Sequence, residues 1–240
     1  MRIPCSLRTA LPLLLVLAYG CSPSESPEAE PATEASEATP TQFETTEVAE
    51  GVWRFRWVGH NGLFIATPEG VIVVDPIGTE AAAVFAEQVT DVLGDTPLLA
   101  VVYSHRDADH ATGAEVIRAA LGPDAPIVAH QNALAPLLES ADPDLPAPTI
   151  TYADRYSFES SRDVQLHHPG PSHSDDQSIV LIPDVGVAFA VDFVAMDRVA
   201  YRDLTGWHMP GQIGAVEHLQ GLDFETIVFG HGPNGDKASI

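Results

Sequence analysis

Residues 104–110 read Ser104-His105-Arg106-Asp107-Ala108-Asp109-His110 and follow the apolar run Leu98–Tyr103. This run predicts a buried strand, because it is short, apolar and partly β-branched. The loop at its end carries two imidazoles and two carboxylates, whose nitrogen and oxygen atoms are ligands for divalent cations. The alternative is a polar turn in an acidic protein, and three further segments argue against it.

Each of these segments also follows a strand-like run. His173 lies in Pro169–Ser174, Asp192 follows Ala190-Val191, and His231 lies between Gly230 and Gly232. Because strand ends meet at one edge of a sheet, residues that are remote in sequence can come together there. The neighbouring glycines permit the tight turns that would aim these imidazoles.

In order and spacing, these residues resemble the metallo-β-lactamase superfamily. Its signature is His-x-His-x-Asp-His, followed by a lone His, a bridging Asp and a last His. The resemblance covers residues 43–240 and implies an α+β fold, the four-layer αβ/βα sandwich. It also implies two metal ions. The first would be bound by His105, Asp107 and His173, the second by Asp109, His110 and His231, and Asp192 would bridge the two. Asn61 and Asp75 match positions that support such a site from behind the ligands.

Asp107 departs from the pattern, since the family has a second histidine there. The carboxylate replaces a neutral nitrogen by an anionic oxygen, so that two divalent ions, three aspartates and a hydroxide form a formally neutral centre. A less positive centre lowers the acidity of bound water. Zinc is the metal first expected, and Asp107 shifts the preference toward iron or manganese.

The remaining histidines are weaker candidates. His173 is preferred to His167 and His168 as a ligand because of its spacing from Gly170. Three residues lie in loops of the kind that cover substrate in this family, with ordinary surface loops as an equal alternative: His60, Trp207 and His208. His130 and His218 are expected to face solvent or to support the fold.

The periodicity of the chain changes at Phe43. Strands are expected at residues 52–58, 63–67, 70–75, 98–103, 126–129, 164–166, 178–182, 187–191 and 226–229, and helices at 79–93, 112–121, 131–138 and 213–219. This order favours two packed sheets with helices outside.

The segment before Phe43 predicts export. Residues 1–20 have a charged start and a short apolar run, which is typical of a signal peptide, and Cys21 stands where a bacterial lipoprotein is lipidated. A plain secretory signal is the alternative. Residues 21–42 are rich in Ser, Pro, Glu, Ala and Thr and predict a disordered linker. We therefore expect a protein of the cell envelope, tethered only through lipid, or of the periplasm.

Composition limits the partners. The net charge is −23, from 11 Lys plus Arg against 34 Asp plus Glu, which argues against binding nucleic acid. The only two cysteines are Cys5 and Cys21, so the domain has no thiolate ligand. A small-molecule substrate is expected, and the sequence does not predict an oligomeric state.

The resemblance implies a metal-dependent hydrolase that activates water against an ester, lactone, amide (β-lactam) or sulfate, with Asp109 as the catalytic carboxylate. The alternatives are a non-catalytic metal-binding module and a flavodiiron-like redox centre. The chain ends nine residues after His231, where relatives usually continue with a helix, so either a fragment or a trimmed C-terminus is expected.

Overall fold

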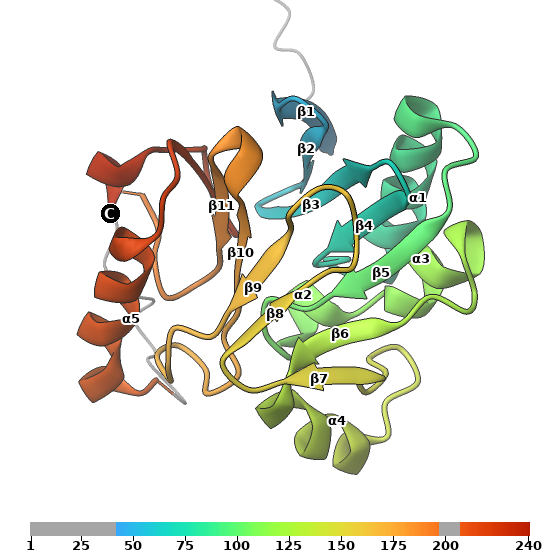
Figure 1. Ribbon diagram of the computed structural model, residues 1–240. Coiled ribbons are helices and arrows are strands. Elements are labelled where there is room, and N and C mark those ends of the chain that lie inside the picture. The colour runs from blue at the N-terminus through green and yellow to red at the C-terminus, as the bar shows by residue number, and fades with distance from the viewer. Residues whose placement is uncertain (1–41, 197–206) are drawn as a thin grey trace, which may run out of the picture. The chain divides into compact units, whose positions relative to one another are not determined.

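The computed structural model describes residues 42–196 and 207–240 (Figure 1). The predicted signal peptide, Cys21 and almost all of the predicted linker lie outside these residues. By its internal contacts the chain divides into Met1–Thr39 and Pro40–Ile240, and the fold described below is that of the second unit.

The first sheet has seven strands in the order of the sequence, β1-β2-β3-β4-β5-β6-β7. β1 to β4 are antiparallel, and β4 to β7 are parallel. The strands are β1 (Phe43–Ala49), β2 (Val52–Trp57), β3 (His60–Thr67), β4 (Gly70–Val74), β5 (Leu98–Val102), β6 (Ile127–His130) and β7 (Ile150–Tyr152). β4 and β5 are buried almost throughout, as their apolar runs predict.

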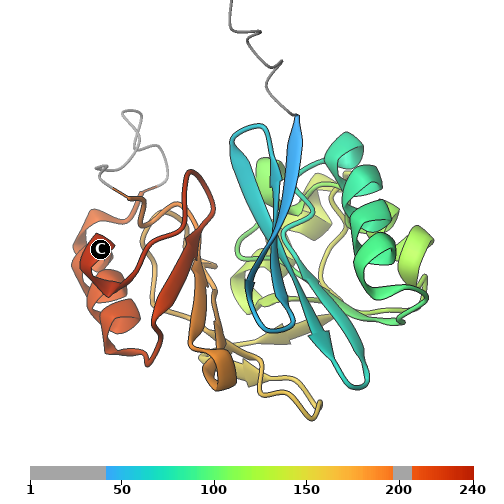
Figure 2. The ribbon, with the colours of Figure 1, turned by 90° about the horizontal axis from the view of Figure 1, so that it is seen from above.

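The second sheet has the order β12-β11-β10-β9-β8, with a parallel pair at β11 and β12 and antiparallel pairs elsewhere. Its strands are β8 (Arg155–Ser157), β9 (Gln165–His167), β10 (Ile179–Ile182), β11 (Val187–Ala190) and β12 (Thr226–Phe229). Apolar side chains from the inner faces of both sheets form one core between them, and Figure 2 shows the two sheets facing each other.

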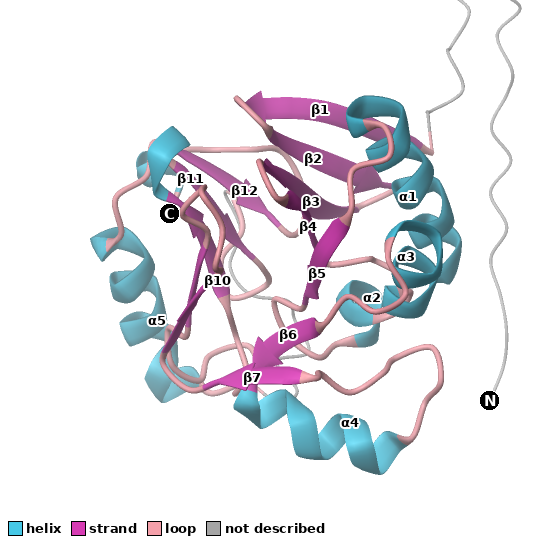
Figure 3. Ribbon diagram, turned by 45° about the vertical axis from the view of Figure 1, so that its right-hand side comes forward, coloured by secondary structure: helices cyan, strands magenta, loops and turns pink. Residues whose placement is uncertain are grey.

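Helices cover the two outer faces (Figure 3). The outer face of the first sheet packs against α1 (Thr79–Leu93), α2 (Ala108–Ala111), α3 (Ala114–Leu121) and α4 (Leu134–Ser140), and that of the second against α5 (Met209–Gly221). Single 3₁₀ turns occupy Gln131–Ala133, Pro183–Val185 and Lys237–Ser239. The order helix, sheet, sheet, helix confirms the expected α+β, four-layer sandwich.

Three local expectations were wrong. The helix expected at 112–121 begins at Ala114, because Gly113 before it has a φ of 99°, which a helix cannot contain, and the short α2 stands in the preceding stretch, where a loop was expected. β3 begins at His60, three residues before the expected Leu63. The sequence patterns also did not predict β1, β7 and β8, of which the last two have only three residues each.

Among the described residues, no helix has the length and apolar character needed to cross a bilayer.

Candidate metal centre

Strand ends and the loop after β9 bring the predicted ligands together. β5 leads into Ser104-His105, β11 into Asp192, and β12 into His231. Within the described residues, two groups of four side chains each place one nitrogen or oxygen per residue within 4.8 Å of the others: His105, Asp107, His173 and Asp192; and His60, Asp109, His110 and His231. All seven predicted metal ligands lie in these groups.

The first group is built around carboxylate oxygens. His173 Nε2 lies 3.0 Å from Asp107 Oδ2, and His105 Nε2 lies 3.5 Å from the same atom. The adjacent imidazoles of His105 and His173 hold the pKa of Asp107 far below its usual range. His105 is fully buried, whereas the side chain of Asp107 is 46% exposed. This group therefore joins a buried strand end to a surface open to solvent.

The second group is richer in imidazoles. His110 Nε2 and His231 Nε2 are 3.3 Å apart, and His60 Nε2 lies 3.1 Å from Asp109 Oδ2. The hydrogen bond with His60 lowers the pKa of Asp109, so this carboxylate is ionised at neutral pH. The side chain of Asp109 is 54% exposed and His110 is buried.

Asp192 lies between the two groups. Its Oδ2 is 3.4 Å from His105 Nε2 and 3.5 Å from both His110 Nε2 and His173 Nε2, and its Oδ1 is 3.0 Å from His231 Nε2. Its φ of 64° turns the chain sharply after β11, a conformation that aspartate tolerates better than most residues. Among the carboxylates of the described residues, only Asp192 thus contacts histidines of both groups.

Residues behind the ligands fix the other ring nitrogens. Asp75, with a φ of 52° after β4, accepts hydrogen bonds from Ser104 N (2.7 Å) and Ser104 Oγ (2.6 Å). The same carboxylate lies 3.2 Å from His110 Nδ1, and Ser104 Oγ lies 3.0 Å from His105 Nδ1. A histidine whose Nδ1–H is held in this way presents a free Nε2 lone pair, which is the usual arrangement of metal-binding histidines.

The start of β3 fixes the last predicted ligand, His231. Asn61 Nδ2 donates to Phe229 O (2.8 Å) and Gly232 O (2.9 Å), so a buried amide fixes the turn around His231. His231 Nδ1 lies 3.0 Å from Gly59 O. Asn61 and Asp75 therefore both stand directly behind the ligand groups.

The titration of the centre reflects its crowding. Burial alone would lower the pKa of His105, but Asp107 and Asp192 outweigh burial and raise it well above its ordinary value. Burial is likewise outweighed at His110, where Asp192 and Asp75 raise the pKa to about 9. Burial would raise the pKa of Asp192, and the surrounding imidazoles reverse this effect and hold it far below the usual range. In the metal-free protein, His105 and His110 are therefore protonated at neutral pH, whereas Asp107 and Asp192 are ionised.

The donor set fits divalent metal ions. Five imidazoles and three carboxylates converge, all five through Nε2. His105 Nε2 and Asp192 Oδ1 are buried, and neither makes a hydrogen bond of normal geometry within the described residues. Buried polar atoms of this kind need a partner, and a cation would supply one.

The three residues expected to cover substrate lie in different places in the structure. His60 was expected in a loop that covers substrate, but it is the first residue of β3 and contacts Asp109. The ring of Trp207 lies edge-on to that of His173, with centroids 5.1 Å apart, so it borders the first group. His208 caps α5, since its Nδ1 accepts from Gly211 N.

The other four histidines lie outside both groups. His130 is buried and stacks on His168, with ring centroids 3.8 Å apart, so it supports the fold. On β9, His167 Nε2 donates a hydrogen bond to Gln165 Oε1, and His218 is exposed on α5. The preference for His173 over His167 and His168 agrees with this placement.

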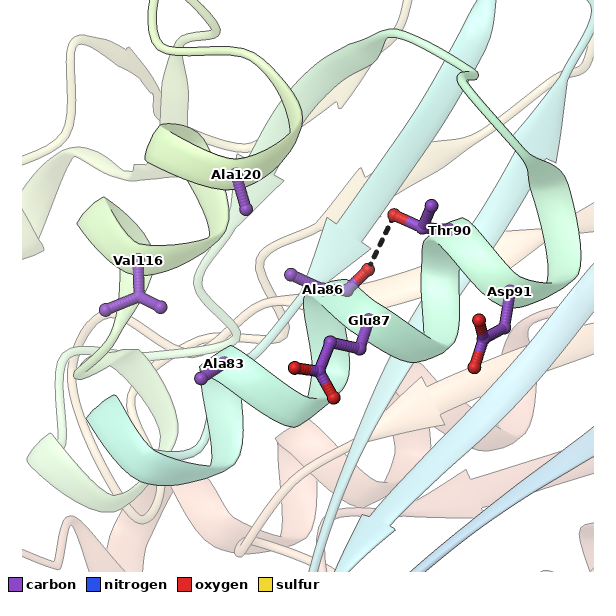
Figure 4. Close-up of a pocket in the computed structure, with 7 residues that line it drawn as sticks. All are labelled: Ala83, Ala86, Glu87, Thr90, Asp91, Val116 and Ala120. Atoms are coloured by element: carbon purple, nitrogen blue, oxygen red, sulfur yellow. Dashed lines mark hydrogen bonds between the residues drawn. The ribbon is translucent and has the colours of Figure 1, made fainter.

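A surface hollow of about 380 Å³ lies apart from the ligand groups, between α1 and α3 (Figure 4). Its polar side chains are Glu87, Thr90 and Asp91, and Thr90 Oγ1 donates to Ala86 O within α1. The rest of its lining is Ala and Val, so it resembles a groove between two helices, without converging donors.

Comparison with known proteins agrees with this geometry. The sequence model of the metallo-beta-lactamase superfamily matches residues 55–231, from β2 to the last ligand histidine. The chain belongs to the metallo-beta-lactamase superfamily. Members of this superfamily are mostly hydrolases.

Solved structures share the fold. A metallo-beta-lactamase from Pontibacter korlensis is 21% identical, with a TM-score of 0.71, and the match covers 82% of this chain and 95% of that one. A metallo-beta-lactamase from Erythrobacter litoralis is 20% identical, with a TM-score of 0.69, and the match covers 84% of this chain and 94% of that one. The metallo-beta-lactamase FIM-1 from Pseudomonas aeruginosa, in its mono-zinc form, is 18% identical, with a TM-score of 0.70, and the match covers 82% of this chain and 91% of that one.

A more similar sequence has a different activity in its name. The 2,4-dinitroanisole O-demethylase subunit beta of Nocardioides sp. (strain JS1661) is 28% identical over 203 residues. The match covers 81% of this chain and 60% of the relative, so the chain spans about three fifths of that protein.

Proposed function

We propose that this superfamily member is a metal-dependent hydrolase with a centre for two divalent ions. One observation carries the proposal: two groups of donors meet at Asp192, and the imidazoles of His105, His110 and His231 each have an oxygen 3.0–3.2 Å from Nδ1 on the far side while Nε2 faces the centre. A purely structural cluster of charges would not need this uniform orientation.

The residues would divide as follows. The first ion would be held by His105, Asp107 and His173, and the second by Asp109, His110 and His231, with Asp192 between them. Bound ions would polarise the substrate and lower the pKa of water toward neutrality. Zinc suits this donor set, and the carboxylate of Asp107 in place of a histidine favours iron or manganese at the first group.

The side chains of the centre have separate tasks. Asp109 is ionised and more than half exposed, so it can accept a hydrogen bond from an attacking water and orient it. Asp75 and Ser104 face Nδ1 of His110 and His105, so Nε2 is the nitrogen that each imidazole would offer to a metal once the metal displaces its proton. Trp207 can form an apolar wall beside His173.

Metal analysis and a substrate panel test the proposal. The full chain, stripped of metal and reloaded with zinc, manganese or iron(II), should bind two ions and hydrolyse at least one of a nitrophenyl ester, a lactone, a chromogenic β-lactam and an aryl sulfate. Asp192→Ala should lose the second ion and about 100-fold or more in rate, since it contacts both groups. Asp223→Ala, an exposed aspartate outside the centre, is the matched control.

The other outcomes are distinct. One ion or none, with no hydrolysis, would favour the non-catalytic binding module. A coloured iron centre that reduces oxygen or peroxide would favour the redox alternative.

A second candidate is the cleavage of an activated aryl methyl ether. The Nocardioides relative is named as a subunit of a 2,4-dinitroanisole O-demethylase, and attack by water on the ring carbon would release methanol and a nitrophenolate. 2,4-Dinitroanisole therefore belongs in the panel, and its yellow phenolate product gives a direct assay.

We also propose that the chain is exported and lipidated at Cys21. The support is the sequence of residues 1–21 alone. Labelling of the wild type but not of Cys21→Ser by a fatty acid in a bacterial host would support this, and equal labelling would overturn it.

A further inference from the structure

We propose that His60 is a fourth ligand of the second metal, which makes the two sites of the centre unequal. The inference rests on the metal centre proposed above. The superfamily signature given above has no histidine at the position of His60. In the structure it stands at the beginning of β3, with its side chain 30% exposed and its Nε2 turned into the second group.

The donor spacing supports ligation. Four donors around a zinc ion at 2.0–2.1 Å, the usual zinc–nitrogen distance, are separated by roughly 3.3 Å along each edge of the tetrahedron. His110 Nε2 and His231 Nε2 are 3.3 Å apart, and His60 Nε2 and Asp109 Oδ2 are 3.1 Å apart. The rings of His60 and His231 are 4.5 Å apart, so all four donors face one small volume.

The backbone fixes His60 where this role needs it. His60 pairs with Trp57 across the β2–β3 turn and forms an isolated bridge with His231. The next residue, Asn61, bonds Gly230 O through its backbone N–H, at 2.8 Å. A ligand placed on a strand is held more precisely than one on a loop. Backbone hydrogen bonds thus fix the position of His60 relative to His231.

The two sites then differ in chemistry. With Asp192 counted for both sites, the first offers two nitrogens and two oxygens, whereas the second offers three nitrogens and two oxygens. Imidazole nitrogen suits zinc, and carboxylate oxygen suits manganese and similar hard ions. The second site should therefore take zinc first and more tightly, and the first site should be the one that accepts manganese.

Metal titration of the stripped full chain tests this ligand role. With a chromophoric chelator as competitor, zinc should bind the wild type in a tight step and a weaker step. His60→Gln should weaken the tight step about 10- to 100-fold, the size of effect expected when the support of a metal site is lost, and leave the weaker step in place. His218→Gln, an exposed histidine on α5, should change neither step.

Cobalt spectroscopy gives a second test. The visible absorption of Co(II) depends on the number and kind of its ligands, so the spectrum of cobalt at the tight site should change in His60→Gln and stay unchanged in His218→Gln. Unchanged zinc steps, or an unchanged cobalt spectrum, in folded His60→Gln would overturn the ligand role. Failure of the wild type to bind two ions would instead overturn the proposed dinuclear centre.

Discussion

At the scale of single residues, the proposed metal preference depends most on Asp107. Its Oδ2 lies 3.0 Å from His173 Nε2, in the position of the second motif histidine. Asp107→His exchanges an anionic oxygen for a neutral nitrogen, which favours zinc over manganese. We expect the ratio of zinc to manganese affinity at the weaker site to rise about tenfold or more. Competition titrations with both metals measure it, and an unchanged ratio would remove Asp107 from the ligand set.

Asp75 is the residue on which two ligands depend. Its carboxylate accepts two hydrogen bonds from Ser104 and faces His110 Nδ1, and all three residues are buried. In Asp75→Asn an amide NH₂ must face one of these donors. We expect metal affinity to fall 10- to 100-fold and the free energy of unfolding of the metal-free protein to fall by about 1–3 kcal/mol.

Titration and urea unfolding measure the two effects. Asp124→Asn, on an exposed turn, is the control. A variant of Asp75 that behaved like this control would contradict the supporting role.

At the scale of elements, apolar patterning predicts the buried strands, and tertiary contacts determine the rest. β4, β5, β11 and β12 were predicted within one or two residues, because runs of Val, Ile, Leu and Phe can only be buried. The early start of β3 is different. His60, Asn61 and Gly62 read locally as a turn, and it is their pairing with β2, together with the bonds from Asn61 to carbonyls beside His231, that extends the strand. The second-site role of His60 was therefore not visible in the pattern.

Gly62 shows how tightly β3 is seated against β4. A Cβ at this position would lie 2.4 Å from Asp75 O and 2.7 Å from Val74 O, both backbone atoms that cannot move aside singly. We expect Gly62→Ala to destabilise the protein by about 1–3 kcal/mol and to weaken metal binding. In Gly59→Ala nothing lies within 4 Å of the added carbon, so it should leave the melting temperature almost unchanged. Equal melting temperatures for the two variants would contradict this account.

At the scale of the whole molecule, the sandwich brings together donors that are far apart in the sequence. The ligand residues follow β5, β9, β11 and β12, and His60 opens β3, so both sheets contribute. Strand-end reasoning predicted that such residues could meet, but their division into two groups came from the resemblance to the superfamily. The substrate is not predictable in the same way, because side chains around the centre determine it and no motif in this chain specifies them.

The protonation of the centre links metal binding to the stability of the whole fold. The pKa of His110 is about 9 in the folded protein, against about 6.5 in an unfolded chain. Its contribution to stability is therefore full below about pH 6.5 and is lost as pH rises through 9. Asp107 and Asp192 have lowered pKa values, so their contribution is present above about pH 4 and is lost in acid.

The metal-free protein should accordingly be most stable between about pH 4.5 and 6.5, and should lose stability toward pH 9. Zinc displaces the protons, so its affinity should rise over the same interval, with release of protons. Urea unfolding and zinc competition at several pH values measure both trends. Asp192→Asn removes the main anionic partner and should flatten the alkaline decline. A metal-free protein that gained stability from pH 6.5 to 9 would show that the buried imidazoles are not held as cations by these carboxylates.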